Sequence, residues 1–313
     1  MIKIGLVSID VSHPLGFATQ FEKYCMDMKY EYMCKESFRG DDEAEWFKNR
    51  FGLAGIVKNI GDMVDKVDIG FIQSCNWEKH LDQAMPFIEK GKPVFIDKPI
   101  VGSMKDIERL RVLVKNGAVI YGSSSARYCS EIQSFLAKPV EERGEIVSIY
   151  ATCGVDEFNY GIHVMEILSA LAQSKAVRTK HVGTSDTELK CEVYNVQFEN
   201  GILGTYHITI GKWQPFHINI MTTKGTFSIV VDSSQLYVTM LREIYKKFNG
   251  KSNIMTDVET LINCTHAMLC GKKSRDTLNG QWVSIDMLDE NDKFDGYEFE
   301  KKYGTGAAIT YKD

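Results

Sequence analysis

The sequence predicts an α/β protein built from a doubly wound parallel sheet followed by an α+β domain with a large, mostly antiparallel open sheet. Three observations support this fold class. Strands and helices alternate over the first 122 residues, which is typical of a parallel sheet. Beyond that point, strands follow one another through short turns. The length of 313 residues also exceeds one ordinary domain. We therefore expect domains at residues 1–122 and 123–313.

The N-terminal elements follow from hydrophobic periodicity. The run VDIGFIQS is almost continuously apolar, as in a strand that is buried on both faces. A serine cap and a final glycine delimit the helix of SMKDIERLRVLVKNG. The expected strands are 2–8, 30–35, 67–74, 94–96 and 118–123, and the expected helices are one around Phe17 and Phe21, then 41–52, 77–90 and 103–117.

The C-terminal elements have a different pattern, because polar and apolar residues alternate along each strand. Asn200-Gly201 and Lys224-Gly225 are turn signals that join neighbouring strands into hairpins. Thr256 and Glu259 form a capping box at the start of a late helix. The expected strands are 145–153, 191–198, 202–210, 216–222 and 226–231, with a helix at 159–172.

Composition excludes several classes of protein. The formal net charge is −5 and there is no basic block, so we expect no nucleic-acid partner. The first residues alternate like a strand, and no apolar run approaches the length of a membrane span, so we expect no membrane association. Eight scattered cysteines without a C-x-x-C motif indicate reduced thiols. A cytoplasmic location is the simplest expectation.

Polar residues follow three of the predicted parallel strands. Ser8 to His13 follow the first strand, Ser74 to Asn76 follow VDIGFIQ, and Asp97 with Lys98 ends the strand VFI. Ligands of open parallel sheets bind beyond the carboxyl ends of the strands, so these clusters should share one crevice. A lysine held there can donate a hydrogen bond to a reacting oxygen. A solvated strand-end lysine paired with Asp97 is the alternative.

Several motifs together resemble the Gfo/Idh/MocA oxidoreductase family. The stretch from VDIGFIQSCN to VFIDKPI resembles its fourth strand through its Glu-Lys-Pro motif, with His80 included and Asp97 in place of the usual glutamate. NYGIHVMEIL resembles the Gly-x-His segment, and VQFENGILGTYHITI and TTKGTFSI resemble its sheet hairpin and later Gly-Thr turn. The resemblance extends to about residue 285 and implies a Rossmann-type N-terminal domain.

The resemblance also implies an activity. Members oxidise or reduce sugars, cyclitols or related alcohols with NAD or NADP, and they form homo-oligomers, here a dimer or tetramer. His163 would take the hydroxyl proton of a small-molecule substrate, and Lys98 would hydrogen-bond the same oxygen. Asn159 stands where the family often has an aspartate, so we expect a less basic His163 or a role shared with Tyr160. By position, Arg127 and Tyr160 are candidates for the substrate pocket.

The phosphate-binding loop departs from the family pattern. The residues that align with G-x-G-x-x-G are SIDVSH, so all three glycines are absent and Asp10 could place a carboxylate near the phosphates. His13 might face the phosphates instead. Asp10 and His13 alone make too few ligands for a metal site, and we expect none.

The cofactor-binding residues are expected along the whole crevice. Glu36 could accept from the ribose hydroxyls of NAD, whereas Arg39 could meet the 2′-phosphate of NADP, so the choice stays open. The expected set is Ser8, Asp10, His13, Glu36, Ser74, Asn76, His80, Asp97 and Lys98.

Two alternatives to a dehydrogenase remain at this stage. A catalytically silent, ligand-binding or regulatory relative would have lost the cofactor together with the glycines. A redox-neutral enzyme, such as a lyase or hydrolase, would use a retained cofactor transiently. The lysine and histidine in both catalytic settings favour the dehydrogenase.

Overall fold

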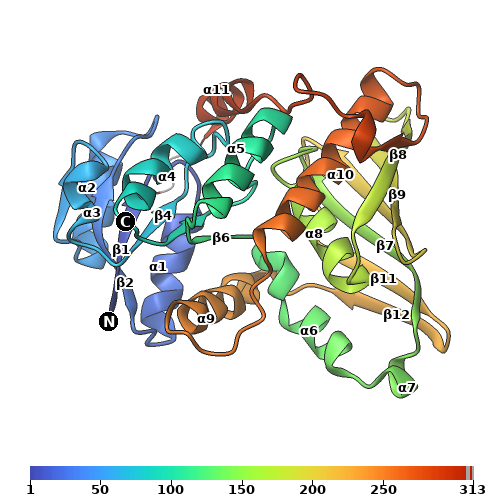
Figure 1. The fold of residues 1–313 in the computed structure, drawn as a ribbon, viewed down its shortest axis with the longest axis horizontal. Helices are drawn as coiled ribbons and strands as arrows, with labels where there is room; N and C mark the ends of the chain where they lie inside the picture. Colours follow the sequence, from blue (N-terminus) through green and yellow to red (C-terminus); the bar gives the residue numbers. More distant parts are fainter. Residues whose placement is uncertain (308–310, 312–313) are drawn as a thin grey trace.

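A computed structural model describes residues 1–307 and 311. Two sheets lie side by side, each with helices packed on it, and the chain passes from one to the other after β6 (Figure 1). Helices α8 and α10 lie between the second sheet and the N-terminal domain (Figure 1). The predicted fold class is confirmed, because the first sheet is parallel and the second is mostly antiparallel.

The first sheet contains six parallel strands in the order β3-β2-β1-β4-β5-β6. The strand order reverses between β1 and β4, and such a switch point opens a crevice at the carboxyl ends of the strands. The strands are β1 (Ile2–Val7), β2 (Met28–Cys34), β3 (Gly55–Val57), β4 (Ile69–Ile72), β5 (Val94–Ile96) and β6 (Ile120–Gly122).

Five helices connect these strands. Helix α4 begins at His80, three residues later than expected, and continues through Pro86. The helices are α1 (His13–Lys23), α2 (Asp41–Phe51), α3 (Gly61–Val64), α4 (His80–Glu89) and α5 (Met104–Lys115).

The second sheet has seven strands in the order β12-β11-β7-β10-β9-β8-β13. Both hairpins predicted from turn residues are confirmed, since β9 pairs with β10 and β11 with β12 in antiparallel register. The β7–β10 pair is parallel. The strands are β7 (Ile146–Val155), β8 (Ala176–Thr184), β9 (Cys191–Phe198), β10 (Leu203–Ile210), β11 (His217–Thr222), β12 (Gly225–Val230) and β13 (Val283–Ser284).

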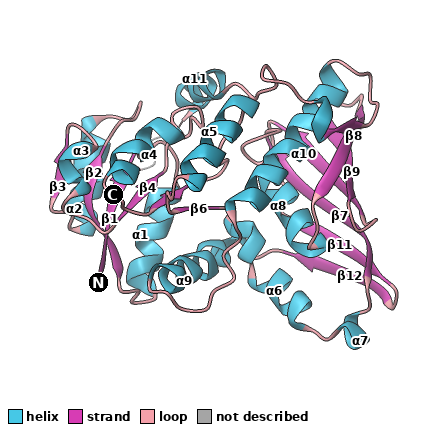
Figure 2. Cartoon of the chain, in the orientation of Figure 1, coloured by secondary structure: helices cyan, strands magenta, loops and turns pink. Residues whose placement is uncertain are grey.

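Of the helices in the second half, α8 and α10 cover one face of this sheet (Figure 2). Helix α8 packs on β7 and helix α10 on β8. The helices are η1 (Ser125–Tyr128), α6 (Ser130–Ala137), α7 (Val140–Arg143), α8 (Gly161–Ala172), η2 (Ser233–Gln235), α9 (Leu236–Phe248), α10 (Val258–Asp276), η3 (Ile285–Met287) and α11 (Gly296–Gly306).

Two helices of the second half return to the first domain. Helix α9 packs on α1 at Gly16, where a Cβ would lie 2.6 Å from the Tyr237 ring, so only glycine allows this approach. Helix α11 lies over the N-terminal domain beside α4 and α5 (Figure 1). Neither helix was among the sequence predictions. The expected capping box was wrong, because Asp257, not Thr256, caps α10 by accepting from the Thr260 amide.

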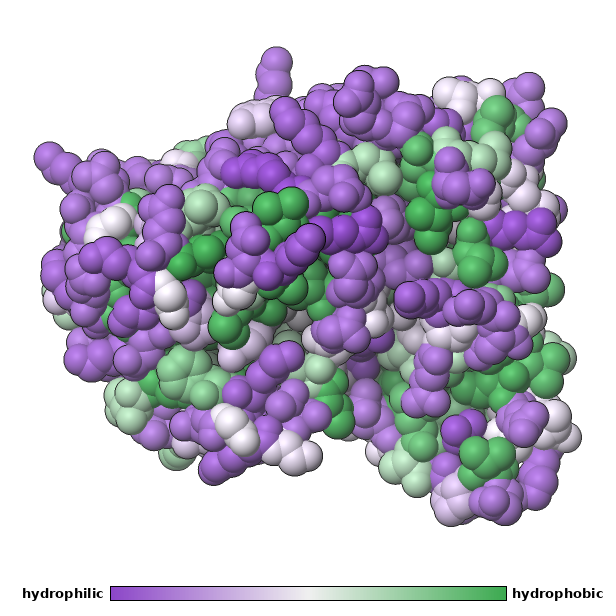
Figure 3. All heavy atoms as spheres, in the orientation of Figure 1, coloured by the Kyte–Doolittle hydropathy of each residue, from purple (hydrophilic) through white to green (hydrophobic). Residues whose placement is uncertain are grey.

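The surface agrees with the composition. The face shown in Figure 3 is mainly hydrophilic, with apolar residues in separate groups.

Along β9, buried and half-buried residues alternate, because one face of the strand packs on helices. In the described part of the chain, no helix is both long and apolar enough to cross a membrane. All eight cysteines are free thiols.

Candidate active site

Lys98 connects the two domains at the end of β5. Its Nζ donates to the backbone oxygen of Asn159 at 3.0 Å and to the Asn159 Oδ1 at 2.9 Å. The Tyr160 ring centroid lies 5.4 Å from the same nitrogen. The Lys98–Pro99 peptide bond is cis. The ammonium of the first domain is therefore held against the segment that leads into α8 of the second domain.

His163 lies in the first turn of α8, next to this lysine contact. Its Nδ1 is 2.5 Å from Ser124 Oγ, and its ring meets those of Tyr160 and Phe216 edge-on, at 5.7 and 5.3 Å between centroids. Ser124 in turn donates its backbone N–H to Glu166. The imidazole is oriented through Nδ1, which leaves Nε2 for a substrate.

Burial controls the charge of both groups. Lys98 is 8% exposed and His163 is 6% exposed. Burial lowers the pKa of Lys98, although Asp97 and Asp156 oppose the shift. Burial, followed by the positive charges of Lys98 and His13, holds the pKa of His163 well below its ordinary value. His163 is therefore neutral near pH 7, as a general base must be before it accepts a proton.

Asn159, which stands where the family often has an aspartate, contacts Lys98. Its side-chain oxygen accepts from the Lys98 ammonium. The expected low basicity of His163 agrees with the structure, with burial as its largest cause rather than the loss of a carboxylate partner.

Asp156 is a residue of this cluster that sequence reasoning missed. Burial raises its pKa, with Lys98 opposing, and its Oδ2 has no hydrogen-bond partner among the described residues. Its Oδ1 accepts from the amides of Phe158 and Tyr160. Val155, just before it, has φ of 90°, a strained conformation for a β-branched residue. No motif in the sequence marks this carboxyl; only its place three residues before Asn159 could have suggested it.

Asp97 faces the N-terminus of α1. Its Oδ2 lies 2.6 Å from His13 Nδ1, and Gln73 Nε2 donates to the same oxygen at 3.3 Å. Burial alone would raise the pKa of Asp97, but His13 and Lys98 outweigh it, and the pKa lies below its ordinary value. His13 is therefore oriented by a carboxylate at the end of β5.

The polar groups of the loop after β1 already form hydrogen bonds with other protein atoms. Asp10 is 0% exposed; its carboxylate accepts from the Cys75 amide at 2.9 Å and from the Ser37 hydroxyl. Ser8, in the place of the family's first glycine, has φ of 71°, a conformation that glycine favours, and its Oγ accepts from the Asp10 amide. The Asp10 carboxylate thus accepts hydrogen bonds from donors that could otherwise face a phosphate.

Helix α11 covers the end of β4. Glu300 accepts from Asn76 Nδ2 at 3.0 Å and pairs with Lys79 at 2.7 Å. Asn76 is consequently 0% exposed. Oxygen and sulfur atoms of Asp10, Cys75 and Glu300 lie within 4.8 Å of one another, but these carboxylates already accept hydrogen bonds from protein donors.

The residues at the end of β2 are also engaged. Glu36 accepts from Gln83 Nε2 at 3.0 Å. The buried Arg39 donates to the backbone oxygen of Asp10 and to Glu43, and lies under the Tyr311 ring at 5.2 Å. Both residues border the crevice, as expected, and each already has a protein partner.

His80 and Ser74 support the crevice from within. The two ring nitrogens of His80 lie 2.9 Å from the Ser74 carbonyl oxygen and 3.2 Å from that of Ile100. The Ser74 hydroxyl donates to Gln83. His80 therefore ties the loop after β4 to the loop that follows Lys98.

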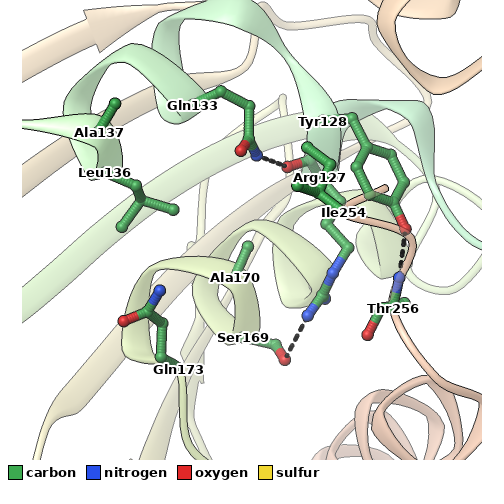
Figure 4. A pocket seen from close by; sticks show the side chains of 10 residues that line it. All are labelled: Arg127, Tyr128, Gln133, Leu136, Ala137, Ser169, Ala170, Gln173, Ile254 and Thr256. Carbon is green, nitrogen blue, oxygen red and sulfur yellow. Dashed lines mark hydrogen bonds between the residues drawn. The ribbon is translucent and has the colours of Figure 1, made fainter. Parts of the chain in front are cut away.

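Arg127 lines a cavity that includes neither Lys98 nor His163. Its guanidinium donates to the Glu166 carbonyl oxygen at 3.1 Å. It also donates to Ser169 Oγ at 3.4 Å (Figure 4). The cavity of about 430 Å³ is bounded by η1, α6, the C-terminal half of α8 and the segment before α10. The charge of Arg127 is directed at α8, whereas Tyr160 stays beside Lys98.

Comparison with known sequences bears on the N-terminal domain. Residues 37–124 match the profile of the oxidoreductase family with an NAD-binding Rossmann fold, known as Gfo/Idh/MocA. The N-terminal domain therefore resembles the Rossmann domain of that oxidoreductase family. The resemblance predicted from the sequence is thereby confirmed. No curated protein matches the sequence.

Solved structures show the same fold over most of the chain. An apo scyllo-inositol dehydrogenase from Lactobacillus casei has a TM-score of 0.77 at 16% identity, covering 91% of this chain and 98% of that one. A myo-inositol dehydrogenase from Lactobacillus casei in complex with NAD(H) and myo-inositol gives 0.77 at 11% identity, covering 92% and 98%. A probable dehydrogenase from Thermotoga maritima gives 0.76 at 14% identity, covering 92% and 100%.

The family match implies a nicotinamide dinucleotide. Some parts of the crevice fit this cofactor and one loop does not. The switch point, Glu36 at the end of β2 and Lys98 at the end of β5 fit the group. The loop of residues 8–13 fits it poorly, because Asp10 already uses the Cys75 amide and α11 covers Asn76.

Proposed function

We propose that this protein is an NAD(P)-dependent oxidoreductase acting on a sugar-, cyclitol- or polyol-like small molecule. The observation that carries the proposal is the contact of Lys98 with Asn159, which brings the lysine of one domain to the helix that bears His163 of the other. The family of the N-terminal domain and the dehydrogenase folds that the chain resembles support the proposal over a catalytically silent relative.

The roles of the two residues follow from their charge states. The neutral His163 accepts the hydroxyl proton of the substrate at Nε2, while Ser124 holds the ring through Nδ1. Lys98 donates to the same oxygen and stabilises the negative charge that develops there. The bound nicotinamide supplies the hydride acceptor, so an alcohol gives a carbonyl compound and one proton, which His163 retains.

The remaining site residues have supporting roles in this proposal. Asn159 fixes Lys98, and Tyr160 forms a wall of the substrate pocket between Lys98 and His163. Glu36 lies where a ribose hydroxyl would be recognised, which favours NAD over NADP. A homo-oligomer, a dimer or tetramer, would assemble through the face of the second sheet away from its helices, where Leu203, Met221 and Val230 are exposed.

Two measurements test the proposal. Fluorescence titration with NADH and NADPH should show saturable binding of at least one of them. Incubation with NAD⁺ or NADP⁺ and a panel of myo-inositol, scyllo-inositol and other polyols should produce absorbance at about 340 nm. Absence of binding of both reduced cofactors at millimolar concentration would refute the proposal.

A redox-neutral enzyme would give a different result in the same experiment. It would release product from a substrate without net formation of reduced cofactor, and cofactor would co-purify with the protein. Product analysis beside the absorbance reading separates the two cases.

A further inference from the structure

We propose that α11 is a displaceable cap on the dinucleotide crevice, so that cofactor binding requires this helix to leave the end of β4. The inference rests on the proposed function and adds a regulatory step to it. Asp10 and Asn76 of the expected binding crevice are both 0% exposed, although the domain matches a family with an NAD-binding fold.

The contacts of α11 are with the crevice itself. Glu300 binds Asn76 and Lys79, which follow β4. Tyr303 packs on Phe38, which follows β2, with ring centroids 6.2 Å apart. The end of β4 borders the switch point and the end of β2 lies on the same edge of the sheet, where dinucleotides lie in folds of this topology. The helix therefore covers the crevice rather than a neutral face of the domain.

The side of the crevice near the second domain is reached as well. Phe299 of α11 packs on the Trp77 ring with centroids 5.1 Å apart, and Trp77 packs in turn on Phe158 of the second domain at 4.9 Å. Burial raises the pKa of Tyr303, in line with its packing on Phe38.

The segment before α11 is anchored firmly. Phe294 is buried, stacks on Phe158 with centroids 4.1 Å apart, and accepts from the Trp77 indole at its backbone oxygen. Asp295 then caps α11 by accepting from the Glu298 amide. A displaced helix would therefore remain tethered at Phe294, and the residues after it would move.

The helix itself buries little of its surface, and Glu300, Phe299 and Tyr303 make its contacts with the domain. Gly296 is the single fully buried residue within α11, whereas α10 buries 12 of its 19 residues. A helix of 11 residues is marginal in water without tertiary contacts, and Gly304 weakens it further. Segments with few buried apolar contacts open at low cost compared with global unfolding. The contrast with α10 identifies α11 as the movable element.

The expected consequence is a reduced apparent affinity for the cofactor. If only a fraction of the molecules is open, the apparent dissociation constant equals the intrinsic one divided by that fraction. Loosening α11 should therefore tighten cofactor binding without changing a residue that contacts the reacting atoms.

The test compares full-length variants by NADH fluorescence titration. Glu300→Gln removes the charge that pairs with Lys79, and Tyr303→Ala removes the ring that reaches the crevice. Glu298→Gln is the matched control, since it makes the same change on an exposed side chain of the same helix. We expect the double variant Glu300→Gln, Tyr303→Ala to bind NADH about tenfold more tightly, and the control to match the unmodified protein.

Hydrogen exchange gives an independent readout. Addition of NADH to the unmodified protein should accelerate exchange of the α11 amides while leaving those of α10 protected. Equal NADH affinity in all variants, with unchanged α11 exchange, would overturn the cap and leave the proposed function intact. Failure of every variant to bind NADH would overturn the proposed function, and the cap with it.

Discussion

The two ends of the crevice differ in how their polar groups are used. At the catalytic end, Lys98 and His163 come from different domains and each retains capacity for a substrate oxygen. At the phosphate end, Asp10 is bonded to Ser37 and Cys75 within its own domain. The difference shows that the two groups proposed for proton transfer retain capacity for a ligand, whereas the Cys75 amide near the proposed pyrophosphate site is already satisfied by a protein carboxylate.

Loss of His163 should give the largest effect. His163→Ala should lower kcat on the most active polyol by about a hundred- to ten-thousandfold, because a positioned base contributes that much, while NADH affinity changes little. Steady-state kinetics and NADH titration check both parts. His207→Ala, a histidine on β10 beside Tyr150, is the control and should retain activity. Similar losses in both variants would contradict the assignment.

Replacement of Lys98 should give the next largest loss of activity. Lys98→Ala should lower kcat/KM by about a hundredfold, since it removes a charged donor to the developing oxyanion. Lys92→Ala removes a lysine just before the same strand, whose Nζ donates to the Val67 carbonyl oxygen, and should leave kcat/KM unchanged. If Lys98→Ala keeps full activity, the catalytic end as described here is wrong.

A substitution at the phosphate end should lower the stability of the fold rather than the catalytic rate. Asp10→Ala leaves the buried Cys75 amide without its acceptor, which should lower the free energy of unfolding by about 1 to 3 kcal/mol. Urea denaturation measures this. Asp65→Ala, on an exposed carboxylate paired with Lys90, is the control with a change below about 1 kcal/mol. If Asp10→Ala leaves the free energy of unfolding unchanged, the loop does not depend on this carboxylate.

The smallest expected effect is on the pH dependence of stability, which should report that His163 is buried in its neutral form. The pKa of His163 is well below its ordinary value in the folded protein, so only the unfolded chain gains a proton as pH falls below about 6.5. Stability therefore falls on acidification through this range, because protonation favours the unfolded chain. Urea midpoints at pH 8 and pH 5.5, compared with those of His163→Gln, isolate this contribution. An equal pH dependence in both proteins would contradict a buried neutral His163.

Much of the fold was predictable from local signals. The alternation of strands and helices predicted the parallel sheet, and Asn200-Gly201 predicted the β9–β10 hairpin, because these turn residues favour positive φ. The crevice was predictable because polar residues follow three parallel strands. Helix α11 was not predicted, since its few apolar residues give no continuous stripe and its position depends on contacts with residues more than 200 positions earlier.

The sequence by itself determined the topology class and the family resemblance of the N-terminal domain, and it pointed to the lysine and histidine that we propose as catalytic. The tertiary structure decided which partners they have: Asn159 holds Lys98, Asp156 lies buried nearby, and Arg127 faces another cavity. Local periodicity encodes secondary structure because it acts over a few residues. Side-chain partners and burial depend on packing between segments far apart in the chain, which no local pattern specifies.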